Sequence, residues 1–157
     1  MRRALGADRL ALRSLWLELI EHHRRLDSEY PPPRGVESVL EREIERALAG
    51  SDVRAFVADG EDGAAPVGFL LAEITPDAGW IHELFVVPMQ RRAGVGRALL
   101  SLATAWFDSR AVHRRCVRVE QANATGLSFW RAAGYVDDAP PRHAAAERNA
   151  RFLQRAC

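Results

Sequence analysis

Residues 86–98 read Val86-Val87-Pro88-Met89-Gln90-Arg91-Arg92-Ala93-Gly94-Val95-Gly96-Arg97-Ala98 and join an apolar strand to a helix. The first turn of a helix carries unpaired backbone N–H groups and a partial positive charge. Glycines let a phosphate approach those amides, and arginines add fork-shaped donors. The stretch therefore predicts a cradle for a diphosphate. A tight turn with solvated arginines is the alternative, and neither the P-loop nor the Rossmann pattern is present.

Short apolar runs precede this stretch, and Gly- and Pro-containing turns separate them. They predict an antiparallel meander of three strands, at 53–58, 67–74 and 80–87. After the stretch, apolar residues recur at helical spacing up to Trp106, and a further strand follows at 112–120. A strand, a crossover helix and a second strand form a βαβ unit, so strands 80–87 and 112–120 should run parallel.

Helical patterns and weaker strand patterns fill the rest of the chain. Helices are predicted at 10–25, 36–49 and 124–133. Asp8 can cap the start of the first helix, Gly50 ends the second, and Gly134 ends the third. Strands are predicted at 135–137 and, as a last edge strand, at 151–155. We therefore expect one α/β (α+β) domain over residues 1–157, in which the last edge strand is the one element assigned to the tail from about 138.

Composition excludes several classes of protein. The 22 basic and 21 acidic residues give a net charge of +1, which argues against a nucleic-acid binder. Cys116 and Cys157 are too few for a disulfide framework or a zinc cluster, so we expect no metal, and Cys116 should be a small core residue. No apolar run approaches the roughly 18 residues of a membrane span, and charged residues interrupt the N-terminal leucines. We expect a cytoplasmic protein.

The loop resembles the acyl-coenzyme A-binding motif of the GNAT superfamily of N-acetyltransferases. In that family a strand ending in Val-x-Pro is followed by Arg/Gln-x-x-Gly-x-Gly/Ala at the start of a helix. Val86, Pro88, Arg91, Gly94 and Gly96 fill those positions.

A second family signature, Asn-x-x-Ala-x-x-Phe-Tyr-x-x-x-Gly-Phe, resembles residues 123–135. Asn123, Phe129 and Gly134 keep their places, while the sequence departs at three others: Gly126 replaces Ala, Trp130 replaces Tyr, and Tyr135 replaces Phe. The resemblance covers about residues 5–137. The usual first strand would lie before Asp8, where Met1–Ala7 is a poor strand.

The resemblance implies a mixed, mostly antiparallel sheet with one splayed parallel pair, flanked by helices. It implies acetyl-CoA as cosubstrate, with the pantetheine arm laid as an extra strand beside residues 85–87 and the Val86 amide near the thioester oxygen. Asn123 would contact the coenzyme, cap a helix, or do both. The implied coenzyme-binding residues are Phe85, Val86, Val87, Arg91, Arg92, Ala93, Gly94, Val95, Gly96, Arg97, Asn123 and Trp130.

The acid and base of the reaction are harder to assign. Many family members have a Tyr at the Trp130 position that protonates the leaving thiolate, but an indole offers only an N–H donor. Trp130 should therefore pack against the coenzyme or the core, and the acid role is vacant, filled by water or unnecessary. Glu83, in mid-strand, is the candidate general base or else a structural partner of an arginine. His82 is the reserve candidate, on the other face by alternation unless a bulge intervenes.

The first two helices and their loop wall the acceptor site in the family. His22, His23, Asp27 and Tyr30, with Glu29, are therefore candidate acceptor contacts, and acidic groups there would suit a cationic amine. The implied reaction is direct attack of a small-molecule or peptide primary amine on acetyl-CoA in a ternary complex. A non-catalytic acyl-CoA-binding regulatory module and an anion-binding interaction domain are the alternatives. We expect no membrane or nucleic-acid partner and keep a homodimer as a candidate assembly.

Overall fold

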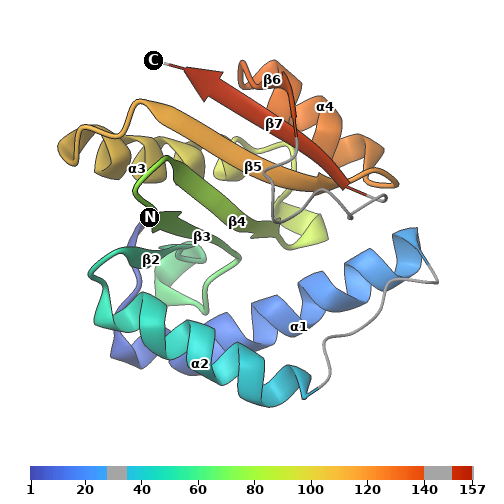
Figure 1. The fold of residues 1–157 in the computed structure, drawn as a ribbon. Helices are drawn as coiled ribbons and strands as arrows, with labels where there is room; N and C mark the ends of the chain where they lie inside the picture. Colours follow the sequence, from blue (N-terminus) through green and yellow to red (C-terminus); the bar gives the residue numbers. More distant parts are fainter. Residues whose placement is uncertain (28–34, 140–149, 157) are drawn as a thin grey trace.

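The computed structural model describes residues 1–27, 35–139 and 150–156, which form a seven-stranded sheet flanked by helices (Figure 1). The strand order is β1-β2-β3-β4-β5-β7-β6, and only β4 and β5 pair in parallel. The strands are β1 Arg2–Arg3, β2 Val53–Ala58, β3 Gly68–Ile74, β4 Gly79–Val86, β5 Arg114–Glu120, β6 Val136–Asp138 and β7 Ala150–Ala156. The helices are α1 Arg9–Leu26, α2 Val36–Ala49, α3 Val95–Ser109 and α4 Ala124–Ala132. The predicted mixed sheet with one parallel pair is confirmed.

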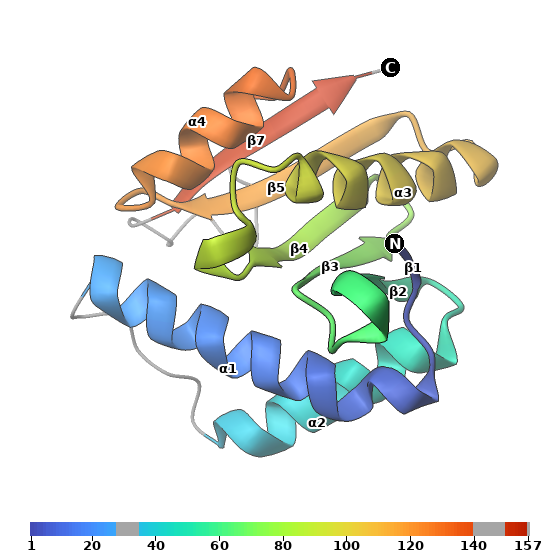
Figure 2. The same ribbon diagram turned by 180° about the vertical axis from the view of Figure 1, so that it is seen from behind.

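Helices cover both faces of the sheet. Helices α1 and α2 lie against one face, and α3 and α4 lie against the other (Figure 2). Strand β3 contributes side chains to the cores on both faces of the sheet. Leu70 packs in the core under α3, while Phe69 and Leu71 pack under α1 and α2. The nearly continuous apolar run of β3 is therefore buried on both faces.

The parallel pair opens soon after it begins. The register between β4 and β5 runs from Gly79↔Arg115 to Ile81↔Val117 and stops there. Strand β5 continues to Glu120 with β7 on its other side, and β4 continues to Val86 with β3 on its other side. The carboxyl-terminal parts of β4 and β5 thus separate, which confirms the predicted splay.

A β-bulge in β4 changes the direction of the side chains at this opening. Leu71 pairs with Glu83 and the next residue, Ala72, pairs with Ile81, so His82 is the extra residue. Paired residues share a face, so Glu83 lies on the α1 side with Leu71, whereas Ile81 lies on the α3 side. Regular alternation would have put Ile81 and Glu83 on the same face.

Three sequence-based expectations need correction. Strand β7 is not an edge strand, because it lies between β5 and β6. The N-terminus forms a short strand after all, with Arg2 and Arg3 paired to β2. Asp8 does not cap α1: its carboxylate accepts hydrogen bonds from the Arg2 guanidinium at 2.7 and 2.8 Å and from the Leu5 N–H at 2.7 Å.

Other local predictions are confirmed. Helix α2 ends at Gly50, whose φ of 75° suits glycine, and Gly134 follows α4 with a φ of 87°. Cys116 is buried in β5. None of the helices in the described ranges has the length and apolarity that crossing a membrane would require.

Candidate functional site

A cavity of about 780 Å³ occupies the opening between β4 and β5. Its walls come from both splayed strands, the loop before α3 and its first turn, one side of α4 along its length, and the last turns of α1. The two helix N-termini meet there because α3 follows β4 and α4 follows β5, so both begin at the open end of the sheet (Figure 2). The described residues contain no cluster of three or more His, Cys, Asp or Glu that could hold a metal ion.

The first turn of α3 presents free amides to this cavity. The bond from the Ala98 N–H to the Gly94 oxygen, at 3.0 Å, is the first of the helix, so the amides of Val95, Gly96 and Arg97 precede it. Gly94 has a φ of 82°, and a Cβ added there would meet no atom within 4 Å. A Cβ on Gly96 would lie 3.4 Å from the Phe129 ring. The amides are therefore open to an anion from the cavity side.

Arg91 takes a position that its sequence motif does not reveal. Its Nε donates to the Val86 carbonyl at 2.9 Å, and its guanidinium carbon lies 5.6 Å from the centre of the Phe85 ring. Arg92 and Arg97 are exposed beside the same cavity. Arg91 is thus held against β4, whereas Arg92 in the loop and Arg97 in the first turn of α3 face solvent.

The edge of β4 that faces the opening has unpaired backbone groups. The Val87 N–H bonds to the Val67 oxygen across to the β3 side at 2.9 Å. Alternate residues of a strand direct their backbone groups to opposite sides, so Leu84 and Val86 direct theirs toward the opening. The bond from Arg91 to the Val86 carbonyl agrees with this direction. An extended ligand with amide groups could pair with this edge.

Most of the predicted coenzyme-binding residues line the cavity, and two do not. Val87 packs in the core under α1 and α2, and Ala93 lies outside the lining. The lining includes Phe85, Val86, Arg91, Arg92, Gly94, Val95, Gly96, Arg97, Asn123 and Trp130.

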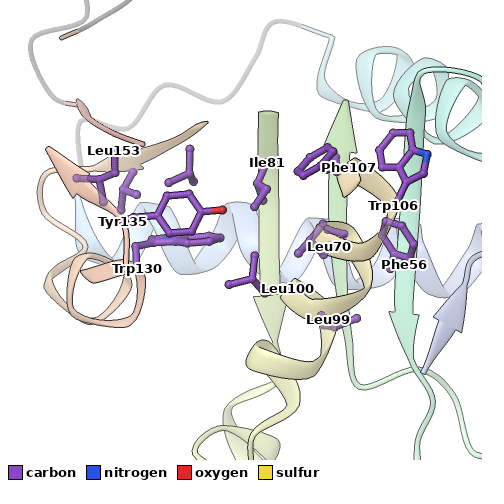
Figure 3. Close-up of a cluster of buried hydrophobic side chains, with 14 of the residues drawn as sticks. Phe56, Leu70, Ile81, Leu99, Leu100, Trp106, Phe107, Trp130, Tyr135 and Leu153 are labelled. Carbon is purple, nitrogen blue, oxygen red and sulfur yellow. The ribbon is translucent and has the colours of Figure 1, made fainter. Parts of the chain in front are cut away.

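Asn123 and Trp130 have local roles that the structure makes clear. The Asn123 Oδ1 accepts from the Gly126 N–H at 2.8 Å and caps α4, while the side chain also lines the cavity. Trp130 is 5% exposed, and its ring meets that of Phe129 edge-on at a centroid distance of 5.1 Å. It also meets Tyr135 edge-on at 5.0 Å (Figure 3). Trp130 is thus a core residue with one side on the cavity.

Glu83 projects its carboxyl group into the cavity between β4 and α1. It makes no hydrogen bond or ion pair with any residue in 1–27, 35–139 or 150–156. Burial raises the pKa of Glu83 to about 8, the charge of Arg118 lowers the pKa, and the charge of Glu120 raises it. The group is a carboxyl that holds its proton near neutral pH.

His82 is occupied elsewhere. Its Nε2 lies 2.8 Å from Glu73 Oε2 at the surface, and the other Glu73 oxygen accepts from Arg46 at 2.9 Å. Glu73 alternates with Leu71 on β3, so the bulge places His82 and Glu83 on one face, contrary to the expectation from regular alternation.

Two of the candidate acceptor contacts in the described part of the chain reach the cavity. His22 and His23 line it, and the His22 ring lies 6.4 Å from the Phe85 ring. Burial foremost, then the charges of His22 and Arg118, lower the pKa of His23 to about 4. Burial and the charges of Arg91 and Arg25 lower the pKa of His22. Both imidazoles are therefore largely neutral near pH 7.

Asp27, the other candidate among the described residues, is not in the lining. Asp27 follows the end of α1, where its N–H bonds to the His23 oxygen. Tyr30 lies outside the described residues, as does Glu29. The carboxyl group that faces the cavity from the described part of the chain is that of Glu83.

Sequence reasoning missed Arg118 and its partner. Arg118 lines the cavity from β5, and its Nη1 lies 2.7 Å from Oε1 of the buried Glu120. The available signal was the alternation of Arg118 and Glu120 with Val117 and Val119 in the second half of β5. Alternation marks such residues as sharing one face, but the fold is needed to show that this face is the cavity wall.

One family of known proteins matches most of this chain. Residues 16–135 match the model of the acetyltransferase (GNAT) family. Among curated protein sequences, no significant match was found.

Solved structures share the fold. PaiA N-acetyltransferase from Thermoplasma acidophilum, in complex with coenzyme A, aligns with a TM-score of 0.77 at 16% identity over 99% of this chain and 97% of its own. AAC(6′)-Iy, in complex with the bisubstrate analogue CoA-S-monomethyl-acetylneamine, aligns with a TM-score of 0.69 at 16% identity over 89% of this chain and 92% of its own. Nourseothricin acetyltransferase aligns with a TM-score of 0.60 at 27% identity over 68% of this chain and 66% of its own.

Proposed function

The chain belongs to the acetyltransferase (GNAT) family, and from that premise we propose that it moves an acetyl group from acetyl-CoA to a primary amine. One observation carries the proposal: an open backbone edge of β4 and the free first turn of α3 meet in a single cavity that also contains Glu83. Such a cavity can take an elongated anionic cosubstrate and leave a carboxyl group beside its far end.

The coenzyme would be held by backbone groups and arginines. Its diphosphate would bind the amides of Val95, Gly96 and Arg97, with the exposed Arg92 guanidinium as a further donor. The amides of its pantetheine arm would pair with Leu84 and Val86 along the open edge of β4. The Val86 carbonyl can accept a second hydrogen bond beside the one from Arg91, since a carbonyl oxygen has two lone pairs.

The transfer needs one proton acceptor and one site for negative charge. The nitrogen lone pair of the amine attacks the thioester carbonyl carbon, and the C–S bond breaks to release the thiolate of coenzyme A. The Val86 N–H would stabilise the oxyanion that forms on the carbonyl oxygen. Glu83, once ionised, would accept the proton that the amine nitrogen must lose. Trp130 supplies no proton, and a thiolate leaves without one.

A small-molecule amine is the acceptor class that the neighbours favour, and a peptide amine is the other. The AAC(6′)-Iy ligand joins coenzyme A to an acetylneamine, and nourseothricin acetyltransferase is named for a small molecule. Leu19, His22 and Phe85 give the acceptor end of this cavity an apolar and aromatic wall.

An acceptor screen tests the proposal. Purified protein would be mixed with acetyl-CoA and one amine at a time, with free thiol followed by colour and product by mass. We expect thiol release that depends on the amine and a product heavier by one acetyl group. Coenzyme A binding by calorimetry without transfer to any amine class would instead favour the non-catalytic acyl-CoA-binding module.

A further inference from the structure

Arg118 and Glu120 lie on the same face of the sheet as Glu83. Val117 and Val119 belong to the core under α3, so the residues that alternate with them on β5 face the α1 side. The bulge at His82 turns Glu83 to that side as well. Because the β4–β5 ladder ends at Ile81↔Val117, Glu83 and Arg118 follow directly after the point where the strands part.

One guanidinium therefore stands near two carboxyl groups. Arg118 Nη1 binds Glu120 Oε1 at 2.7 Å, and Glu120 is 8% exposed. Glu83 lines the same cavity as Arg118 yet makes no ion pair with it. An arginine that paired with Glu83 would hold it as a carboxylate of low proton affinity, which is a poor base.

From this arrangement we infer that Glu120 holds Arg118 away from Glu83, so that Glu83 keeps enough proton affinity to take the proton of the acceptor amine. Arg118 and Glu120 are then positioning residues for the base. The inference rests on the proposed role of Glu83 in acyl transfer. The proton moves from the amine nitrogen to one Glu83 carboxylate oxygen, and no further reactant is needed.

Electrostatics support this geometry. The charge of Arg118 lowers the pKa of Glu83, and the charge of Glu120 raises it. His22 and His23 face the group from α1 with lowered pKa values, so they add little charge near pH 7. Of the other charged or titratable groups in the described lining, His82 binds Glu73, Arg91 binds the Val86 carbonyl, and Arg92 and Arg97 are exposed.

Two substitutions should move the pH dependence in opposite directions. In Glu120→Gln, Arg118 loses its bond to Glu120 and can turn toward Glu83. The acid limb of the pH profile of kcat/KM should then shift to lower pH by about 1–3 units, the usual effect of a close opposite charge. In Arg118→Gln, Glu83 loses the positive charge that favours its ionised form. The acid limb of the kcat/KM profile should therefore shift to higher pH. A purely structural role would lower activity in both variants without opposite shifts.

The same shifts should be seen without catalysis. The carboxyl carbon of Glu83, labelled with ¹³C and followed by NMR in the coenzyme-free protein, should titrate at lower pH in Glu120→Gln and at higher pH in Arg118→Gln. This readout holds even if the protein transfers no acyl group, so it separates this inference from the proposed function.

Asp108→Asn is the matched control. Asp108 pairs with Arg115, another arginine of β5, but neither residue lines the cavity. This variant should leave the Glu83 titration unchanged. If Glu120→Gln unfolds, Glu120→Asp, which keeps the charge, provides the second measurement. In that variant the Glu83 carboxyl group should titrate close to its pH in the wild type. An unchanged or raised Glu83 titration in Glu120→Gln would overturn the inference, as would equal shifts in Glu120→Gln and Asp108→Asn.

Discussion

At the residue scale, the proposed role of Glu83 as the base predicts how activity depends on pH. Its pKa of about 8 means that it carries a proton at neutral pH and becomes a base as the pH rises through 8. We expect wild-type kcat/KM to rise through about pH 8. In Glu83→Gln that step should vanish, with a loss of about 10²–10⁴-fold near pH 8. The loss should shrink above about pH 10, where free amine is abundant.

Initial rates of thiol release from about pH 6 to about pH 11 test this expectation. Glu18→Gln is a suitable control, because Glu18 is an exposed residue of α1 outside the cavity lining. The role of Glu83 is refuted if its variant keeps the wild-type profile.

Trp130 is the second residue with a specific expectation. Its ring is packed edge-on against Phe129 and Tyr135 and offers only an indole N–H. Trp130→Phe keeps an aromatic ring there, so it should retain most of the turnover at saturating acetyl-CoA. Steady-state kinetics measure the turnover. Calorimetry of coenzyme A binding checks that the site is still folded. A hundredfold fall in kcat at unchanged coenzyme affinity would show that the indole takes part in proton transfer.

At the element scale, the turn into α3 is the part of the site that the sequence describes best. Gly94 and Gly63 make a matched pair: their φ values are 82° and 78°, and a Cβ on either meets nothing within 4 Å. Valine at either site should therefore cost similar backbone strain. Only Gly94 lines the cavity. Gly94→Val should weaken coenzyme A binding about tenfold or more, or 1.4 kcal/mol, while Gly63→Val should not. Equal affinities by calorimetry would contradict the diphosphate cradle.

Local patterns of this kind explain what could be predicted. The period of α3, the glycines that end α2 and α4, and the cradle loop follow from contacts a few residues apart, so the sequence predicts them. The bulge at His82 depends on its pairing with Leu71 and Ala72, and the interior place of β7 depends on pairing with β5. No short-range pattern encodes such pairings. Arg118 and Glu120 therefore do not stand out in the sequence, and the face of His82 is decided only by the bulge, the exception that the sequence leaves open.

At the scale of the whole molecule, two groups of strands meet at a short seam. Strands β1 to β4 form one group and β5, β7 and β6 the other, and the seam is the ladder from Gly79↔Arg115 to Ile81↔Val117. A continuous apolar cluster, with Ile81 on one side and Leu153 on the other, runs across the seam (Figure 3). The cavity opens where the ladder ends, so a ligand in it touches both groups of strands at once.

Coenzyme A should therefore stabilise the protein as a bridge between these groups. A ligand that binds only the folded state at a hundredfold excess over its Kd adds about 2.7 kcal/mol to the free energy of unfolding, which corresponds to a rise in Tm of several degrees for a chain of this size. If the ligand spans the seam, amide hydrogen exchange should slow in Leu84–Val86 and also in Val117–Glu120, on opposite sides of the cavity. Slowing confined to the first turn of α3 would mean that only the diphosphate is held. Gly94→Val, with its weakened cradle, should show a smaller rise in Tm at the same coenzyme concentration, whereas Gly63→Val should match the wild type.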